Sequence, residues 1–221
     1  GLRHNMRGSY AIPTDSLRSK TFTDKFKGTA SSIMDYARYN YVAQPGDGVT
    51  QLAPQIGPYD LYAIEYGYRW YDTQDPEAEK ATLTDFVSAH KGDMYAYSGE
   101  QSMREAVDPR GMSEDLGNDA VKSATYGIDN LKRIVPNILS WTRTGEKGQT
   151  YDEASAIYFG VINQWKLFIY HVMANVGGMY IDNVLPGDGM KAFEFVPRDI
   201  QKKSLQFVMD QALTFPRWLF D

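Results

Sequence analysis

The clearest pattern of apolar and polar positions lies in the second half of the chain. Apolar residues recur at every third or fourth position over residues 116–138, which is the spacing of one face of an α-helix. The same spacing returns over residues 151–175, where the opposite face is also apolar, so we expect this second helix to be central. Pro136 should kink or end the first helix, and the glycines at residues 145–148 indicate a turn. Two helices joined in this way most simply form an antiparallel hairpin.

Two shorter helices are predicted before this hairpin. Pro58 suits the first turn of one helix, whose sequence continues to Tyr68 and is rich in aromatic residues. We favour a packed helix with its hydroxyls at the rim, and the wall of a peptide cleft is the functional alternative. Asp75 followed by Pro76 suits the start of the other helix, which should end near residues 90–92.

The chain closes with a small β-hairpin and one more helix. Apolar runs at residues 179–182 and 191–196 flank a turn-rich stretch and predict two short strands. Residues 197–213 have the spacing of an amphipathic helix, and the aromatic residues at 215–219 follow it as an anchor. A short strand or extended segment is expected at residues 94–100. The predicted fold class is therefore mainly α with minor β: a long helical hairpin, two or three further helices and one β-hairpin.

Residues 1–58 show neither helical nor strand periodicity over any long stretch, and glycine and proline recur along them. We therefore expect these residues to be mostly irregular. A loop-rich segment of this length is uncommon in a compact domain unless it builds a site or wraps a neighbour. The sequence therefore divides into a loop-rich part, residues 1–58, and a helical part, residues 59–221.

Composition and charge exclude several classes of function. The 221 residues carry a net charge of −5, with a pI of about 5.3 and no basic stripe, which argues against nucleic acid as a partner. Cysteine is absent, so disulfides, thiolate metal sites and a cysteine nucleophile are excluded. No apolar run reaches the roughly 18 residues that suggest a membrane-spanning helix, so no membrane span is predicted in this chain.

Two further features could bind a metal, and each also has a structural interpretation. The first is an acidic set that comprises Asp108, Glu114, Asp115 and Asp119. Its oxygen atoms suit a hard cation, but the spacing does not match a calcium-binding loop, and a solvated helix cap is favoured. The second is His171, for which a hydrogen-bonded core histidine is favoured over a metal ligand because its neighbours in the helix are apolar.

The first forty residues carry two short motifs that together indicate a metal site. Residues 1–4 read Gly-Leu-Arg-His and are followed by Asn5, and residues 32–36 read Ser-Ile-Met-Asp-Tyr. In the zinc-peptidase motif H-E-x-x-H-x-x-G-x-x-H, the glycine ends the helix that bears the first two ligands, and the third histidine follows three residues later. Taken alone, His4 could be a frayed terminal residue and Met34 a buried loop residue. Their order and their separation of about 30 residues favour the metal site.

These motifs resemble those of the metzincin family of zinc peptidases, in which a methionine-containing turn lies beneath the metal. The chain is similar to the C-terminal part of large bacterial zinc-dependent metallopeptidases that carry a metzincin-like domain. Residues 37–41, 115–119 and 215–219 share in this similarity, which therefore covers nearly the whole chain.

The resemblance implies a role for three residues. His4 would be the third zinc ligand, Met34 the floor of the site, and Tyr36 an auxiliary ligand or a donor to the oxyanion. It further implies a zinc-activated water that attacks a peptide bond, a peptide or protein substrate, and an extracytoplasmic location, whether periplasmic, secreted or lipid-anchored. Residues 1–58 would then be the end of the catalytic domain, and residues 59–221 a helical C-terminal subdomain.

The sequence departs from the metzincin pattern in one decisive respect. H-E-x-x-H does not occur in the 221 residues, and the three histidines, His4, His90 and His171, form no helical pair. We therefore expect the rest of the site to lie in a longer parent protein, with no zinc bound and no peptidase activity in this fragment alone. The alternative is a non-enzymatic helical module that binds a partner or an extracellular ligand through the aromatic residues at 59–71.

Overall fold

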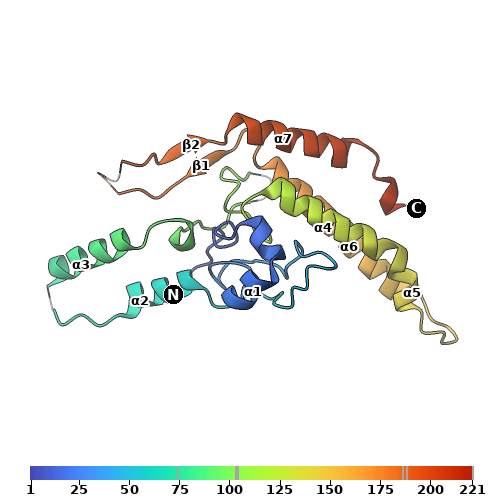
Figure 1. Cartoon of the computed structure of the whole chain (residues 1–221), viewed down its shortest axis with the longest axis horizontal. Coiled ribbons are helices and arrows are strands. Elements are labelled where there is room, and N and C mark those ends of the chain that lie inside the picture. Colours follow the sequence, from blue (N-terminus) through green and yellow to red (C-terminus); the bar gives the residue numbers. More distant parts are fainter. Residues whose placement is uncertain (74, 103–104, 186, 188, 221) are drawn as a thin grey trace.

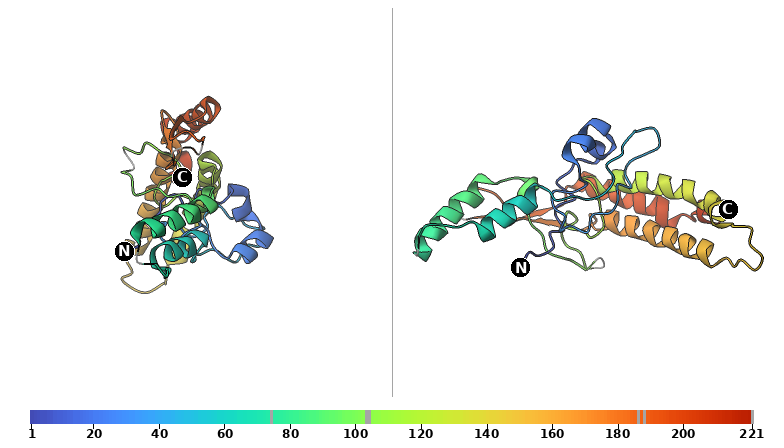
Figure 2. Two further views of the ribbon diagram at one scale, coloured as in Figure 1. Left: turned by 90° about the vertical axis from the view of Figure 1, so that its left-hand side faces the viewer. Right: turned by 90° about the horizontal axis from the view of Figure 1, so that it is seen from below.

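The computed structural model is elongated, with three parts that follow one another along its long axis (Figure 1). It describes residues 1–73, 75–102, 105–185, 187 and 189–220. Helices α2 (Pro58–Tyr68) and α3 (Pro76–Ala89) form one end, and the hairpin of α4 (Ala120–Ile134) and α6 (Asp152–Met173) forms the other. The loop-rich N-terminal part lies between the two ends, as the view from below also shows (Figure 2).

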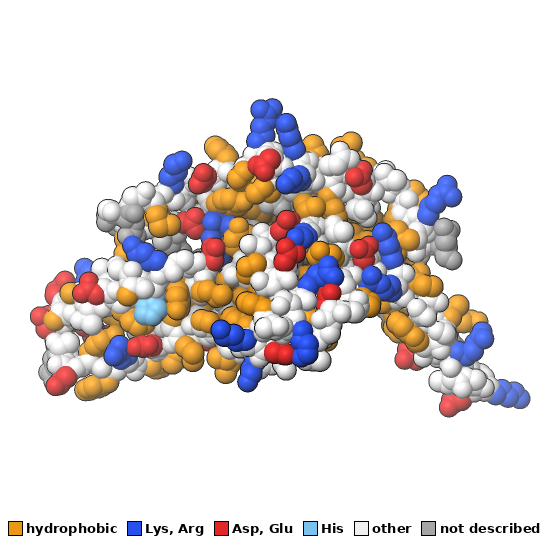
Figure 3. Space-filling view, in the orientation of Figure 1, with side chains coloured by type: hydrophobic (Ala, Val, Ile, Leu, Met, Phe, Trp, Pro, Cys, Tyr) orange, Lys and Arg blue, Asp and Glu red, His pale blue; other side chains and the backbone are white. Residues whose placement is uncertain are grey.

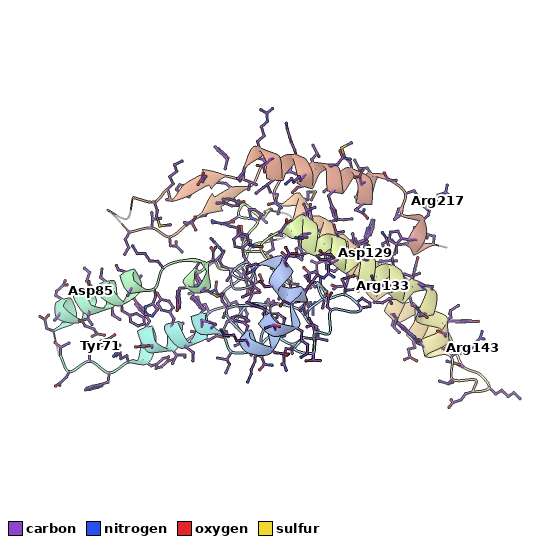
Figure 4. All side chains as sticks on the ribbon, viewed as in Figure 1. Tyr71, Asp85, Asp129, Arg133, Arg143 and Arg217 are labelled. Atoms are coloured by element: carbon purple, nitrogen blue, oxygen red, sulfur yellow. The ribbon has the colours of Figure 1, made fainter. Side chains whose placement is uncertain are left out.

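The predicted helical hairpin is confirmed. Helices α4 and α6 pack side by side and run in opposite directions, with Phe168 buried in their shared core. Pro136 ends the regular helix as predicted, because α4 gives way to a 3₁₀ turn at Val135–Asn137 and then to the short helix α5 (Ile138–Thr142). Arg143 follows α5 toward the tip of the hairpin (Figure 4). No helix in the described residues, α6 included, has the length and apolar character needed to cross a membrane.

Helix α4 begins later than the apolar spacing predicted. Its first residue is Ala120, because the Asp119 carboxylate accepts a hydrogen bond from the Lys122 amide at 3.0 Å and caps the helix there. Leu116 instead lies in the preceding loop, where it is buried in a second core with residues of the N-terminal part. For Asp119, the interpretation as a helix cap is therefore confirmed.

The two shorter helices occur where they were predicted. The Asp75 carboxylate accepts a hydrogen bond from the Glu77 amide at 3.0 Å and caps α3, which ends one residue before His90. Helices α2 and α3 meet through aromatic rings, with 5.4 Å between the ring centroids of Tyr62 and Phe86.

The outer face of α2 is largely exposed in the described chain. Leu61, Ile64 and Tyr68 are 67%, 47% and 73% exposed, and Trp70, just after the helix, is 87% exposed. Hydrophobic side chains accordingly gather at the surface over α2 in the space-filling view (Figure 3). The expectation of a packed helix is wrong for this face, because only the first turn and the side toward α3 find neighbours.

The C-terminal part follows the predicted order of elements. Strands β1 (Met179–Ile181) and β2 (Phe193–Phe195) form an antiparallel pair. Helix α7 (Arg198–Val208) comes next and continues as a turn of π-helix at Met209–Leu213. The β-hairpin and α7 together lie along one long side of the molecule (Figure 1).

The closing aromatic segment, residues 215–219, is anchored only in part. Leu219 is 3% exposed, and its carbonyl oxygen accepts a hydrogen bond from the Tyr158 hydroxyl of α6 at 2.8 Å. Phe215 is 67% exposed. The anchor therefore consists of the last turn rather than the whole segment.

The N-terminal part is mostly irregular, as predicted, yet much of it is buried. The exceptions are a 3₁₀ turn at Thr14–Arg18 and helix α1 (Lys20–Phe26), which the sequence did not predict. The Asn40 side chain provides hydrogen-bond partners for backbone groups that belong to no helix or sheet. Its amide group donates to the Leu17 carbonyl at 2.7 Å, and its oxygen accepts from the Val42 amide at 3.2 Å.

Tyr41 connects the core of the N-terminal part to the core of the helical hairpin. Its ring centroid lies 4.6 Å from that of Phe168, and its hydroxyl accepts a hydrogen bond from the Leu116 amide at 3.0 Å. Asn130 of α4 donates to the Tyr41 carbonyl at 2.9 Å. Such contacts cross residue 58, and the division of the chain at that residue stays a prediction.

His171 is a buried core residue, as the sequence favoured. Its Nε2 atom lies 2.9 Å from the Ser113 carbonyl oxygen, and the residue is 2% exposed. Burial lowers the pKa of His171 from its ordinary value of 6.5 to about 4. Between these two values the unfolded chain binds a proton that the folded chain does not, so this group makes stability rise as the pH rises from about 4 to 6.5.

We predict that Gly127→Ala destabilises the hairpin and that Gly160→Ala does not. A Cβ atom on Gly127 would lie 2.6 Å from the Phe168 ring, so the two helices would have to move apart, at a cost of about 1–3 kcal/mol. Gly160 lies on the exposed face of α6 with open space around it, so alanine there should stabilise the chain by about 0.5–1 kcal/mol. Urea unfolding followed by circular dichroism measures both changes. Equal effects at the two positions would contradict the packing described here.

We also predict that His171→Gln removes part of the pH dependence of stability. Between about pH 4.5 and pH 7 the wild-type histidine should contribute roughly 2.5 kcal/mol to the change in unfolding free energy. The buried carboxyls contribute equally to both proteins, so the difference between the two urea-unfolding series isolates His171. The Gly160→Ala chain serves as the control and should keep the wild-type dependence. An unchanged dependence in His171→Gln would show that the histidine is not protected from protonation.

Candidate functional site

The structure brings His4 and Tyr36 together at the surface of the N-terminal part. Their ring centroids are 4.4 Å apart, and the ring planes are tilted by 49°. The His4 side chain is 36% exposed and Tyr36 is 49% exposed, so both rings reach solvent. The N-terminus itself lies beside α2 (Figure 1). Two residues from separate motifs therefore share one surface.

Asn5 holds the His4 segment in place. Its backbone amide donates to the Met34 carbonyl at 3.0 Å, which ties the two motifs together. Its fully buried side chain donates to the Ala96 carbonyl at 2.9 Å and accepts from the Ser98 amide at 3.1 Å. Those residues belong to the segment 94–100, which was expected to be a strand or extended. The expectation is wrong for Met94 and Tyr95, which lie in a 3₁₀ turn at Asp93–Tyr95, and residues 96–100 follow it without forming a strand.

The loop that carries Met34 is fixed to the start of α2 by one buried carboxylate. Asp60, which is 4% exposed, accepts hydrogen bonds from the Ser32 hydroxyl at 2.6 Å and from the Ile33 amide at 2.8 Å. The same carboxylate accepts from the Gly57 amide at 2.8 Å, so it also caps α2. Met34 is half-buried, and its backbone amide donates to the Ser32 hydroxyl at 3.0 Å.

Gly57 is required by the close approach of two backbones. A Cβ atom at this position would overlap the Ser31 carbonyl oxygen, which accepts a hydrogen bond from the Tyr59 amide at 2.9 Å. The start of α2 and the loop before Met34 are therefore in direct backbone contact. The sequence analysis did not identify Asp60. An acidic residue at the third position of a helix, where Asp60 lies in α2, is a known capping signal.

His4 has one further partner that no sequence pattern indicated. Its Nδ1 atom is hydrogen-bonded to the carboxylate of Glu100. The two residues are 96 positions apart, so this contact depends on the tertiary fold and not on local spacing.

Two buried aspartates lie behind the site and share one serine. The Ser9 amide donates to Asp35 at 2.6 Å, and the Ser9 hydroxyl donates to Asp115 at 2.8 Å. Burial raises the pKa of Asp35 to about 7 and raises the pKa of Asp115 well above its ordinary value. The pair thus retains a proton under conditions in which exposed aspartates are ionised.

The acidic set at residues 108–119 forms no common cation site in the structure. Asp108 forms a salt bridge with Arg110 at 2.8 Å, and Glu114 pairs with Arg38 at 2.6 Å. Burial acts to raise the pKa of Asp108, but hydrogen bonds from Arg110 and from the Ile181 amide outweigh it and lower the pKa. The interpretation as a solvated cap therefore holds for one of the four residues, while the others are engaged in pairs or buried.

A family model described as Met-zincin matches the chain over residues 1–221. The chain belongs to the Met-zincin family. No curated protein and no solved structure matches it. Membership of the Met-zincin family supports a metallopeptidase-like protein and implies zinc as the metal of such proteins.

The described residues of this Met-zincin chain bring His4 and Tyr36 together but do not form a complete set of metal ligands. They contain no group of three or more histidine, aspartate or glutamate side chains placed to hold a metal ion. His90 bonds the Phe86 carbonyl at 2.8 Å through Nδ1, and His171 is buried against Ser113. His4 carries a nitrogen donor of the kind that zinc accepts, and the Tyr36 phenol lies beside it, so the two residues fit as part of a ligand set.

We predict that Asp60→Ala loosens the Met34 loop of this Met-zincin chain. The change leaves the Gly57 and Ile33 amides and the Ser32 hydroxyl without their acceptor, which should cost about 3 kcal/mol. The matched control is Asp75→Ala, which removes an exposed helix cap and should cost about 1 kcal/mol. Hydrogen exchange of the Ile33 amide should accelerate in Asp60→Ala and stay unchanged in the control. Unchanged protection in both variants would exclude Asp60 as the anchor of the loop.

Proposed function

We propose that this chain is the C-terminal part of a bacterial zinc-dependent peptidase and supplies the third zinc ligand. His4 binds the metal, Met34 forms the floor, and Tyr36 lies beside the ligand. A His-Glu-x-x-His segment outside these 221 residues supplies the other two histidines and the general base. The observation that carries the proposal is the approach of the His4 and Tyr36 rings to 4.4 Å, in a chain that matches the Met-zincin family throughout.

The two rings have different roles in the proposed peptide hydrolysis. The chemistry that bound zinc supplies is activation of a water molecule and polarisation of the scissile carbonyl. His4 contributes a neutral nitrogen lone pair from a segment that Asn5 holds rigidly. Tyr36 is exposed enough to turn its phenol toward the substrate and to donate a hydrogen bond to the carbonyl oxygen as negative charge develops there.

A cleft lined in part by tyrosines supports a peptide or protein as the substrate. Its volume is about 260 Å³, and it lies where α2 and α3 approach the β-hairpin, with Tyr62, Tyr95 and Tyr97 in its wall. Tyr97 of this wall lies three residues before Glu100, whose carboxylate contacts His4, and we propose that an extended peptide bound in the cleft reaches the metal. The proposal places the parent protein outside the cytoplasm, whether periplasmic, secreted or lipid-anchored.

A non-enzymatic interaction module is the second candidate function. The outer face of α2, with Leu61, Tyr68 and Trp70 exposed, is the observation that favours it. Large exposed apolar patches are typical of surfaces that bind partners. If the parent protein lacks His-Glu-x-x-His, the peptidase proposal fails and this module takes its place.

We predict that the 221-residue chain alone does not retain stoichiometric zinc, because one imidazole and one phenol are too few ligands for tight binding. A polypeptide that also contains His-Glu-x-x-His should retain one zinc ion and hydrolyse peptides. His4→Ala in that polypeptide should abolish both properties, while His90→Ala, which alters a histidine of the α2–α3 ring cluster, should keep the zinc. Elemental analysis after dialysis and a fluorogenic peptide assay measure these outcomes. Full zinc retention by His4→Ala would overturn the proposal.

A further inference from the structure

We propose that Glu100 is a positioning residue for His4: it holds the imidazole as the Nδ1–H tautomer and thereby presents Nε2 to the metal. The inference rests on the proposed role of His4 as a zinc ligand. It assigns a function to a carboxylate that lies in the segment between α3 and α4, outside both sequence motifs.

The backbone places Glu100 next to His4. The Met6 amide donates to the Ser98 carbonyl at 2.8 Å, and the Asn5 side chain accepts from the Ser98 amide at 3.1 Å. Two extended segments are thereby aligned with one another. His4 lies two residues before Met6, and Glu100 lies two residues after Ser98. Their side chains therefore come together and form a hydrogen bond.

The contact determines which ring nitrogen carries the proton. A carboxylate can only accept hydrogen bonds, and a neutral imidazole has a single N–H group. The proton must therefore lie on Nδ1, the atom in contact with Glu100, and the lone pair on Nε2. Metal-bound histidines nearly always donate their other N–H to a carboxylate, a carbonyl or a water, which fixes the ring and raises its basicity.

The ring is restrained on a second side by Tyr36. The tilted ring contact at 4.4 Å limits rotation of the imidazole, while Glu100 limits it from the Nδ1 edge. Some exposed ion pairs of this chain, such as Lys20 with Asp24, join residues one helical turn apart and need no tertiary structure. The His4–Glu100 pair differs because the buried Asn5 clamp fixes its register.

The first test uses the 221-residue chain and needs no metal. A long-range ¹H–¹⁵N NMR spectrum at about pH 8.5, where histidine is neutral, reports the tautomer of each imidazole. Wild-type His4 should appear as the Nδ1–H tautomer. Glu100→Ala should move it to the Nε2–H tautomer that a free imidazole prefers. Glu100→Gln should do the same, because its amide N–H can donate to an unprotonated Nδ1. Glu105→Ala, in the same segment, is the control and should change nothing.

The second test measures zinc affinity in a polypeptide that also contains His-Glu-x-x-His. Glu100→Ala should weaken zinc binding by about 10–100-fold, and Glu105→Ala should leave it unchanged. The inference is overturned if wild-type His4 is the Nε2–H tautomer, or if Glu100→Ala alters neither the tautomer nor the affinity while His4→Ala abolishes zinc binding. If His4→Ala itself leaves zinc binding intact, the proposed function fails, and the inference fails with it.

Discussion

Much of the N-terminal part is buried although most of it is neither helix nor strand, and this constraint governs the rest of the structure. Backbone amides and carbonyls removed from water need hydrogen-bond partners, and a loop cannot supply them by regular repetition. Three buried side chains meet part of this demand: Asn5, Asn40 and Asp60. Each bonds backbone groups from a different part of the chain, so each also fixes how two segments lie relative to one another.

Buried charge joins this part to the C-terminal hairpin in the same way. Arg7 is 2% exposed, and its guanidinium lies 3.2 Å from both Asp93 and Asp182. Asp182 also pairs with Arg110 at 3.2 Å. The Arg7 guanidinium also lies 3.8 Å from Asp108. A buried arginine must be neutralised by carboxylates, and these three carboxylates come from separate stretches of sequence. The residues before Glu100 are thus held at two places: Asn5 bonds the backbone at Ala96 and Ser98, and Arg7 pairs with Asp93.

The sequence predicted those features that depend on local spacing. The apolar period located α4 and α6, the Asp75–Pro76 pair located the start of α3, and Pro136 located the end of α4. The motifs around His4 and Tyr36 led to the family, and the structure places these two rings in contact; their roles in catalysis stay predictions. Glu100 and Asp60 could not be assigned because their partners are distant in sequence and their proximity arises only from tertiary folding. The outer face of α2 was expected to be packed and is exposed. The sequence shows that these residues are apolar but not whether another element packs against them.

The contact between Gly57 and Ser31 also bears on how mutational data for this chain would be interpreted. Any side chain at Gly57 would push the helix start away from the loop that carries Met34, so nearly every substitution there should be harmful. A saturation-mutagenesis map would then score Gly57 as highly as a residue that touches substrate, although it bears no reactive group. Intolerance to substitution in this region therefore measures how precisely two backbones must meet, and chemical roles must be assigned from the donor atoms themselves.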